Sequence, residues 1–463
     1  MPRRLLVASI SALALLSPAA FAYPPTPLTT YSTSSNVRLL KNVPTGMGVG
    51  GKFSGGYYFH TTARSTGYRG PSGDAISDGG LWVFDVKDPE NPQVAAHLPL
   101  PLWQNEDVDL SAKRKILLIA MDRRTSTAPA PAPIDSPQLP GVLFVYDIAD
   151  PAKPTLKSAL TLPAEVGTDK NGKRLHGAGH TASCVLDCRY AYLTGARDGS
   201  VLVADLRDPA NPKLMGTVAT PAGAAYKAYD PGLVHDVNVD RYGNVWMSGT
   251  GGTAVYAPVR NPMKPQLLAA TSAADNARTN QVIHHNTMRL DRDTVLLSEE
   301  SFNACGADDP ASAEPQGGRF QTWRIDRVAK RLVPLALFSK KVPNVRSCSS
   351  HWMDVNRHEV VADAFFEAGT RFFDVRDPGV MRQVGWFRAN DGAAGQAQYV
   401  PGRPDLVYVS DYLRGLDIVK IDNGGAGAAE VTGTEGEGLT MLPAKLTFRP
   451  SADFGYACPV PSL

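Results

Sequence analysis

After residue 22 the sequence contains no run of 18 or more apolar residues, so no helical membrane anchor is expected. It also lacks Gly-x-Ser-x-Gly, His-Glu-x-x-His and Cys-x-x-Cys-His motifs, which argues against an α/β-hydrolase, a zincin protease and a c-type haem protein. Charge of either sign is nearly balanced, with 47 Lys and Arg against 45 Asp and Glu. Because no basic stripe gathers along the chain, nucleic-acid binding is not expected either.

The N-terminus has the pattern of a secretory signal peptide. A basic segment at residues 1–4 precedes an apolar segment at residues 5–16, and residues 20–22 form a small-x-small cleavage site. The apolar segment is too short for a membrane span. We therefore expect residues 1–22 to be removed and the mature protein to be periplasmic or secreted. Removal takes away both arginines of the basic segment, so the net charge falls from +2 to 0.

One sequence pattern recurs along most of the chain. It consists of a strand-like run, a turn usually written Asp-Pro-x-x-Pro, and a second strand-like run. Clear, variant and degenerate copies together are Gly80–Pro92, Gly141–Pro154, Gly199–Pro212, Gly252–Pro262, Gly369–Pro378, Gly318–Asp326 and Gly415–Asp422. Proline cannot continue a β-ladder, so each copy reads as strand, turn and strand. A further hairpin precedes each copy. Four short strands per unit of roughly 45–65 residues are typical of a propeller blade.

The seven copies predict an all-β fold, a seven-bladed β-propeller over residues 23–422. The last unit supplies only three strands before the chain turns Gly-rich. A segment that resembles the missing fourth strand lies at Asn36–Pro44. Its sequence is similar to that of Pro212–Pro221, the fourth-strand segment of another unit. We therefore predict that the N-terminal strand closes the ring and removes the exposed edge. The Gly-rich tail, residues 423–463, is expected to pack on the outside.

The strand sequences at Leu81–Asp85 and Leu416–Val419 are similar to the repeat motif of a known family. The chain resembles exported bacterial proteins with LVIVD repeats, and the resemblance covers nearly all of the mature sequence. It implies a β-propeller on the far side of the cytoplasmic membrane, and it implies no particular reaction. Cys305 and Cys348 fall where relatives carry cysteines, and we expect these two to form a disulfide.

The chain has only five cysteines, which in an exported protein suggests disulfides with one cysteine left over. Cys184 and Cys188 flank an expected hairpin turn at Val185–Asp187, where they could bridge the turn or stay reduced. The spacing does not match a zinc finger, so a structural role is favoured.

Histidines stand at equivalent positions in several units. When the first strand of each unit is aligned by its distance to the second, the aligned residues are Glu106, His180, His235, His285 and His351. The innermost strands of a propeller line its central channel, so these side chains are expected to face one small volume. The neighbouring His284 would instead point between blades.

Imidazoles that converge in this way commonly share a cation, because neutral imidazole is a frequent ligand of transition metals. We therefore predict a metal site, for copper or zinc, made by the four aligned histidines with Glu106. Glu299 and Glu300 could add a carboxylate ligand, or could orient an imidazole ring through a hydrogen bond without touching the metal. The alternative is a metal-free arrangement in which polar side chains bond water and backbone groups and hold the blades together.

Three functions are compatible with these patterns. The first is an exported binding platform with a metal or ligand site in its channel, and the second is an extracytoplasmic oxidoreductase or hydrolase that uses the metal on a small molecule. The third is a metal-free scaffold that binds an extracellular protein or polysaccharide through long loops. The candidate loops are residues 61–77, 124–140, 164–174, 269–279 and 304–316.

Overall fold

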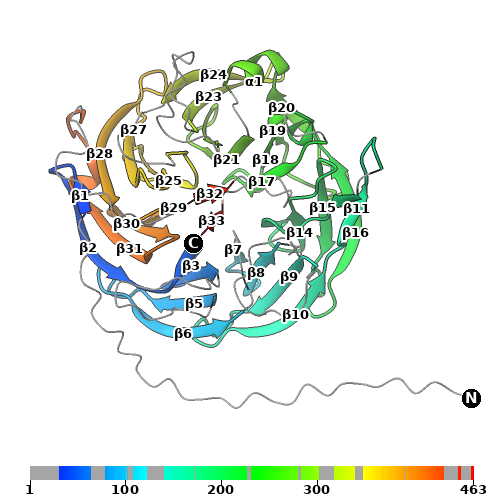
Figure 1. The fold of residues 1–463 in the computed structure, drawn as a ribbon, viewed down its shortest axis with the longest axis horizontal. Helices are drawn as coiled ribbons and strands as arrows, with labels where there is room; N and C mark the ends of the chain where they lie inside the picture. Colours follow the sequence, from blue (N-terminus) through cyan, green and yellow to red (C-terminus); the bar gives the residue numbers. More distant parts are fainter. Residues whose placement is uncertain are drawn as a thin grey trace, which may run out of the picture.

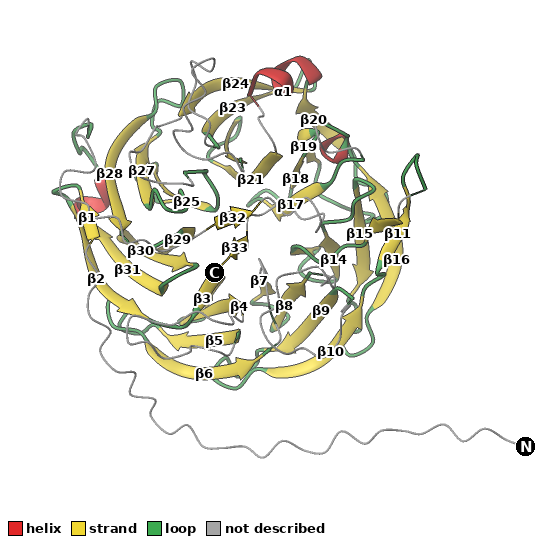
Figure 2. Cartoon of the chain, in the orientation of Figure 1, coloured by secondary structure: helices red, strands yellow, loops and turns green. Residues whose placement is uncertain are grey.

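The protein is a β-propeller, in which small antiparallel sheets surround a common axis (Figure 1). The computed structural model describes residues 31–63, 79–100, 102, 108–122, 140–172, 174–226, 231–279, 283–301, 318–338, 348–390, 392–431, 447–449 and 460–462. In the sheets that begin with β3, β7, β13, β17 and β21, the first strand along the chain lies nearest the axis, and the later strands lie progressively farther out (Figure 2). The predicted β-propeller fold is confirmed.

Three sheets are built from four consecutive strands. They are β3 (Met47–Ser54), β4 (Tyr57–Ala63), β5 (Gly80–Asp85) and β6 (Gln93–Pro99); β7 (Val108–Ser111), β8 (Ile116–Met121), β9 (Val142–Asp147) and β10 (Thr155–Thr161); and β13 (Ala182–Val185), β14 (Tyr190–Leu193), β15 (Ser200–Asp205) and β16 (Lys213–Ala219). All neighbouring strands in these sheets are antiparallel.

The next two groups of four strands are joined into one eight-stranded sheet by a short parallel pairing of β20 with β24. They are β17 (Val234–Val239), β18 (Val245–Gly249), β19 (Gly252–Tyr256) and β20 (Leu267–Thr271); and β21 (Ile283–Arg289), β22 (Thr294–Glu300), β23 (Phe320–Asp326) and β24 (Arg331–Phe338). The connection after β20 contains a short helix, α1 (Ala273–Thr279).

The last two sheets recruit strands from the N-terminus. One contains β25 (Met353–Val355), β26 (Val360–Ala364), β27 (Thr370–Asp374) and β28 (Arg382–Ala389), with β1 (Tyr31–Thr33) at its outer edge; the other contains β29 (Ala394–Val400), β30 (Arg403–Asp411) and β31 (Gly415–Ile421), with β2 (Val37–Val43) outermost. In the second sheet β2 runs antiparallel to β31, from Val37 opposite Ile421 to Val43 opposite Leu416. The N-terminal strand β2 is thus hydrogen-bonded to β31.

The remaining elements are small. They are the hairpin β11 (Glu165–Thr168) and β12 (Arg174–His176), the 3-10 turns Pro221–Gly223 and Asp422–Gly425, and the pair β32 (Thr447–Arg449) and β33 (Val460–Ser462). In the tail, Val431 N–H donates to the Gln383 carbonyl, and β32 and β33 project over the middle of the ring in the view of Figure 1. Packing of the whole tail on the outside stays a prediction.

The repeated aspartate at the end of the third strand has a local role. Its carboxylate accepts a hydrogen bond from the backbone N–H two residues later, for example from Ala149 to Asp147 at 2.8 Å and from Arg207 to Asp205 at 3.0 Å. This side-chain-to-backbone turn satisfies a donor where the strand ends. The repeat therefore encodes both the strand and the turn that ends it.

Apolar side chains between neighbouring sheets form the core. Val201 and Val203 of β15, for example, pack in one cluster with Val245 and Met247 of β18. Burial of each such side chain stabilises the fold by about 1.5–3 kcal/mol. Because every sheet contacts a sheet on each side, the inner residues of the ring are held at fixed heights along the axis.

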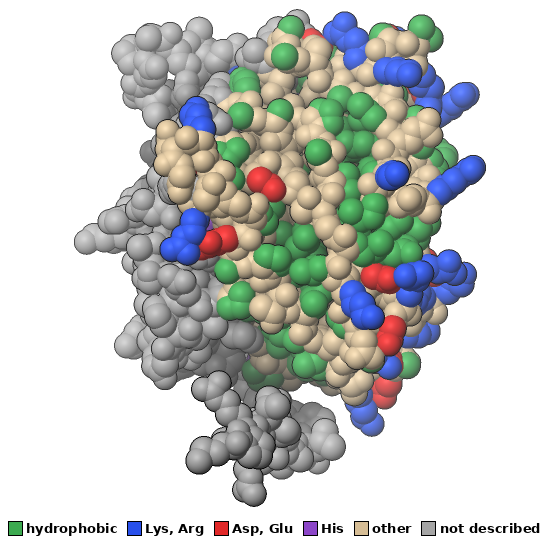
Figure 3. Space-filling view, turned by 90° about the vertical axis from the view of Figure 1, so that its right-hand side faces the viewer, with side chains coloured by type: hydrophobic (Ala, Val, Ile, Leu, Met, Phe, Trp, Pro, Cys, Tyr) green, Lys and Arg blue, Asp and Glu red, His purple; other side chains and the backbone are tan. Residues whose placement is uncertain are grey.

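The outer wall of the ring carries both hydrophobic and charged side chains (Figure 3). In that view Lys and Arg side chains gather toward one edge of the wall, and much of its middle is uncharged. Exposed apolar side chains on the outermost strands include Leu156 and Met215. No helix in the described part of the chain is long and apolar enough to cross a membrane.

Candidate metal centre at the hub

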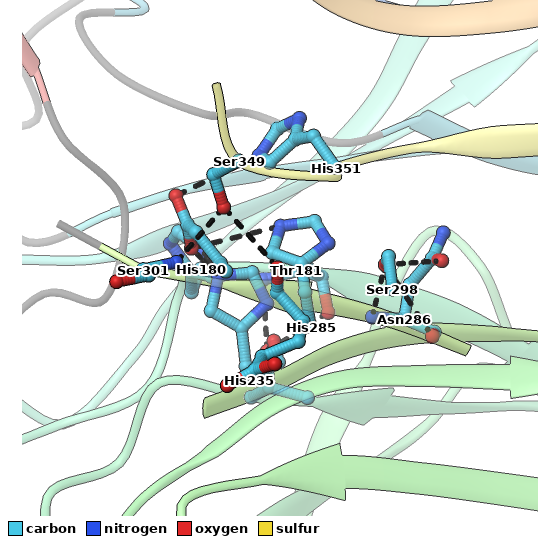
Figure 4. Close-up of polar contacts among 12 residues, drawn as sticks. His180, Thr181, His235, His285, Asn286, Ser298, Ser301, Ser349 and His351 are labelled. Atoms are coloured by element: carbon cyan, nitrogen blue, oxygen red, sulfur yellow. Dashed lines mark hydrogen bonds and ion pairs between the residues drawn. The ribbon is translucent and has the colours of Figure 1, made fainter. Parts of the chain in front are cut away.

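Four buried histidines meet at the axis of the propeller (Figure 4). His180 precedes β13, His235 lies in β17, His285 lies in β21 and His351 precedes β25. Their ring centroids follow one another at 4.4, 4.1 and 4.0 Å. The predicted convergence of these imidazoles is therefore confirmed. We call these four residues the hub histidines.

Irregularities in the innermost strands help to aim two of the rings. The pairing of β17 with β18 shifts register between Val234 and Asp236, and the pairing of β21 with β22 shifts between His284 and Thr287. A β-bulge of this kind changes the direction of a side chain relative to the regular alternation of a strand. His235 and His285 lie within these bulges, so the bulges turn both rings toward the axis.

Each hub imidazole is held by a group of a neighbouring unit. Nδ1 of His180 lies 2.7 Å from Asp122 Oδ2, and Nδ1 of His351 lies 2.5 Å from the carbonyl oxygen of Gly395. The rings of His235 and His285 each form a hydrogen bond to the backbone of the next hub histidine, and this bond raises the pKa of each ring. A backbone group that raises the pKa of a histidine is an acceptor, so it is the carbonyl. Each ring is thus oriented by a neighbouring unit of the propeller.

Nε2 of each hub ring faces inward toward Glu300 at the end of β22. Glu300 Oε2 lies 3.7 Å from His235 Nε2 and 3.9 Å from His285 Nε2, and Glu300 Oε1 lies 4.0 Å from His351 Nε2. Nε2 of His180 is 2.9 Å from Nε2 of His235. The carboxylate and four imidazole nitrogens therefore occupy one small volume without solvent exposure.

Burial keeps the rings of His235, His285 and His351 neutral. It lowers the pKa of His235 and of His285 well below 6.5, and the neighbouring hub imidazoles lower both further. Burial also lowers the pKa of His351 to about 3. At neutral pH these three rings therefore offer lone pairs, which is the form that binds a metal.

The predicted companions of the histidines have different positions. Glu300 faces the rings directly, whereas Glu299 accepts a hydrogen bond from Gln321 Nε2 at 3.1 Å and lies 3.8 Å from Arg319. Successive residues of a strand point to opposite faces, so only one of the two glutamates can face the hub. Glu106 lies outside the described residues, and its role as a ligand stays a prediction.

The histidine next to the hub lies where the sequence suggests. His284 Nδ1 is 3.0 Å from Thr253 Oγ1 of β19, and its ring packs edge-on against Trp323. It is therefore held between adjoining sheets. His60 is also buried away from the hub, with Nδ1 2.9 Å from the Gly50 carbonyl oxygen.

Sequence reasoning did not identify Asp122, the partner of His180. Asp122 directly follows β8, and it is 1 % exposed. An aspartate at the inner end of the apolar run Ile116–Met121 was the available signal, but its partner is 58 residues away in the next sheet. Only the packing of sheet against sheet reveals this contact.

The inner strand of the first sheet, β3, contains no histidine and approaches the preceding sheet closely at Gly48. A Cβ atom at Gly48 of β3 would lie 2.3 Å from the carbonyl oxygen of Gly415. Any side chain there would clash with backbone, so glycine is required at this point of the channel.

Two cysteine predictions have outcomes in the described residues. Cys184 and Cys188 form a disulfide across the turn between β13 and β14. Cys348 is also disulfide-bonded. Cys305 lies outside the described residues, so its pairing with Cys348 stays a prediction.

Comparison with known proteins supports the repeat and the fold. The model of the LVIVD repeat matches residues 178–220, which span His180 and strands β13 to β16. No curated protein matches the sequence significantly.

Several solved β-propellers are similar in structure. The Cps50 (Swd1) β-propeller domain of Myceliophteria thermophila has a TM-score of 0.51 at 12 % identity, covering 82 % of this chain and 98 % of that one. A protein from Lactobacillus plantarum has a TM-score of 0.52 at 11 % identity, covering 81 % and 94 %. A protein from Bacteroides fragilis has a TM-score of 0.54 at 9 % identity, covering 82 % and 95 %. At sequence identities this low, the similarity shows that these proteins share a fold and shows nothing about a shared function.

Proposed function

We propose that this chain is an exported β-propeller that binds one transition-metal ion at its hub, through His235, His285 and Glu300. The observation that carries the proposal is the mutual distance of their ligand atoms, which all lie within 4.8 Å of one another. All three side chains are fully buried. His180 and His351 stand beside them and could complete the coordination.

The outward hydrogen bonds supply the electrostatic argument. When Nδ1 of His351 donates to the Gly395 carbonyl, its inward Nε2 carries the lone pair of the neutral imidazole, and the same holds for any hub ring that is protonated at Nδ1. Lone pairs that face a carboxylate at 3.7–4.0 Å repel it, and burial strengthens the repulsion. A shared cation turns this repulsion into attraction, so the geometry is suited to an ion.

The distances are close to those of a metal site. Ligand atoms about 2.0–2.1 Å from a zinc ion lie roughly 3.3 Å apart in a tetrahedron. The separations of His235 and His285 from Glu300, 3.7 and 3.9 Å, exceed this by a few tenths of an ångström. Small ring movements would close the site. Several nitrogen ligands with one carboxylate favour zinc or copper over calcium or magnesium.

Architecture and export are parts of the same proposal. The repeats together with the pairing of β2 with β31 support a seven-bladed ring closed by the N-terminal strand. The disulfide between Cys184 and Cys188 supports an oxidising compartment, in agreement with the expected signal peptide. We therefore place the protein in the periplasm or outside the cell.

One observation favours a second candidate, a metal-free hub. Nε2 of His180 and Nε2 of His235 are 2.9 Å apart, which is the length of a hydrogen bond and shorter than the spacing of two ligands in a zinc tetrahedron. One proton between these rings would hold them together. In that case the hub would be a polar connection between sheets, and function would rest on other parts of the propeller.

Metal analysis separates the two candidates. Protein purified without added metal or chelator should contain about one zinc or copper ion per chain, measured by inductively coupled plasma mass spectrometry. His285→Ala and Glu300→Ala should lose the ion. His97→Ala should keep it, because His97 lies in the outer strand β6, where its ring stacks on Trp82 of β5. A wild-type protein without stoichiometric metal, and unable to take up zinc or copper, would contradict the proposal.

The same preparations decide whether the site is enzymatic. An oxidoreductase or hydrolase activity that disappears with the ion and returns on reloading would make the protein a metalloenzyme. A stoichiometric ion whose removal changes stability and binding of a small molecule, but supports no turnover, would establish a binding platform.

A further inference from the structure

A second site lies in the channel beside the hub. It is a cavity of about 490 Å³, within the usual range for small-molecule sites. The inner strands β3, β7, β13, β17, β21, β25 and β29 all contribute side chains to it. None of its lining residues is a hub histidine or Glu300.

Trp352 adjoins both the cavity and the hub. It is one of the residues that line the cavity, and its ring centroid lies 5.1 Å from that of His285 with the two planes nearly perpendicular. The backbone of Trp352 is fixed as well, because Ala397 N–H donates to its carbonyl oxygen at 3.3 Å. The cavity therefore has one rigid aromatic wall, which could pack against the C–H groups of a ligand.

Three of the five aspartates that line the cavity are engaged with a basic side chain or with backbone. Asp109 lies 3.2 Å from Lys52 Nζ and accepts a hydrogen bond from Cys184 N–H at 2.9 Å. Asp354 accepts from Tyr399 N–H at 2.9 Å, and Asp240 pairs with Arg289 at 2.9 Å. A strongly charged ligand would have to compete with these contacts, which disfavours it.

Amide groups provide the free hydrogen-bonding capacity. Gln396 Oε1 accepts from Gly51 N–H at 2.6 Å, so its amide N–H groups remain for other partners. Gln398 Oε1 is buried and has no hydrogen-bond partner among the described residues. A buried acceptor of this kind is costly unless a ligand or water donates to it. A primary amide both donates and accepts, so it matches a hydroxyl group, which does the same.

We propose that this cavity binds a small, neutral, polyhydroxylated molecule, with hydroxyl groups on Gln396 and Gln398 and an apolar face against Trp352. The cavity combines one aromatic wall, paired charges and unfilled amide groups, and this combination suits a sugar or polyol better than an ion. The inference does not require a metal at the hub, because the two sites share no proposed ligand residue.

The test is titration calorimetry on the full chain, stripped of metal with a chelator and, separately, loaded with zinc. The probes are glucose, myo-inositol and sorbitol as neutral polyols, putrescine as a cation and citrate as an anion. At least one polyol should give saturable binding in the stripped protein. Binding of putrescine or citrate alone, or saturable heat from none of the polyols, would overturn the proposal.

Variants assign the binding to the cavity. Gln398→Ala should weaken polyol binding by about fivefold to tenfold, the loss expected for one or two hydrogen bonds. Trp352→Leu should weaken it similarly. Gln93→Ala is the matched control, because Gln93 is an exposed glutamine at the start of β6, and it should bind like wild type. Equal affinity in wild type and both cavity variants would refute the assignment, and a circular dichroism spectrum of each variant verifies folding.

Discussion

The Nε2 atoms of His180 and His235 lie 2.9 Å apart at the axis of the propeller, although 55 residues separate them in the chain. His180 is oriented from behind by Asp122, at 2.7 Å from Nδ1, and the ring of His235 is held by the backbone of His285. Two imidazoles fixed in this way present their remaining nitrogens to each other and to Glu300. Substitution of the groups that surround these rings should therefore change the binding of a metal at the hub.

Asp122→Asn should lower the affinity of the hub for zinc or copper by about 10- to 100-fold, the usual effect of removing a carboxylate that orients a metal-binding histidine. The measurement is competition with a chromophoric chelator. Asp147→Asn is the control, because Asp147 caps a turn at the end of β9 and does not touch the hub. An unchanged affinity in Asp122→Asn would show that His180 is not part of the metal site.

Glu300→Gln should reduce the rise in melting temperature that zinc or copper gives the wild-type protein, because the stabilisation that a ligand gives the folded state grows with the logarithm of its affinity. The variant keeps the size of the side chain and removes its charge. Glu299→Gln is a close control, since Glu299 adjoins it in β22 but contacts Arg319 and Gln321 instead. If both variants respond to metal alike, Glu300 is not a ligand.

His60→Gln should make the protein less sensitive to acid. Burial lowers the pKa of His60 to about 4, against 6.5 for an ordinary histidine. The unfolded chain therefore binds more protons between these pH values, and stability falls as pH drops from about 6.5 to 4, by roughly 3 kcal/mol for this residue alone. Glutamine can replace the contacts to Gly50 and Thr45 without taking up a proton.

Urea unfolding of His60→Gln at pH 7.5 and pH 5 measures this effect. The difference in unfolding free energy between the two pH values should be smaller in the variant than in wild type. His358→Gln, in the turn between β25 and β26, is the control and should keep the wild-type difference. A variant with the full wild-type loss at pH 5 would show that His60 is not responsible.

Removal of residues 1–44 should destabilise the ring strongly, because it exposes the edge of β31 to which β2 is hydrogen-bonded. We expect a lower melting temperature and self-association in light scattering. A chain that begins at residue 31 keeps β1 and β2 and is the matched control. A truncated chain that is as stable and monomeric as this control would show that the N-terminal strand does not close the propeller.

Much of the architecture could be predicted from local sequence. The repeated strand run and its Asp-Pro turn predict the β-propeller because both features act locally: side chains that suit a strand, and a carboxylate such as Asp205 that bonds the backbone two residues later. Equivalent positions in the repeats also predicted that His180, His235, His285 and His351 converge. Because the repeats form equivalent units around one axis, inner residues at equivalent positions of the repeats lie close together in space.

The sequence by itself determined the repeat, its turns and the meeting of four imidazoles. Only the tertiary structure decided which nitrogen of each ring faces inward, that Glu300 rather than Glu299 faces the hub, and that Asp122 supports His180. Strand alternation alone leaves the facing glutamate undecided, since a single bulge such as the one at His285 reverses it. Contacts between sheets depend on packing across the ring, and no local pattern records them.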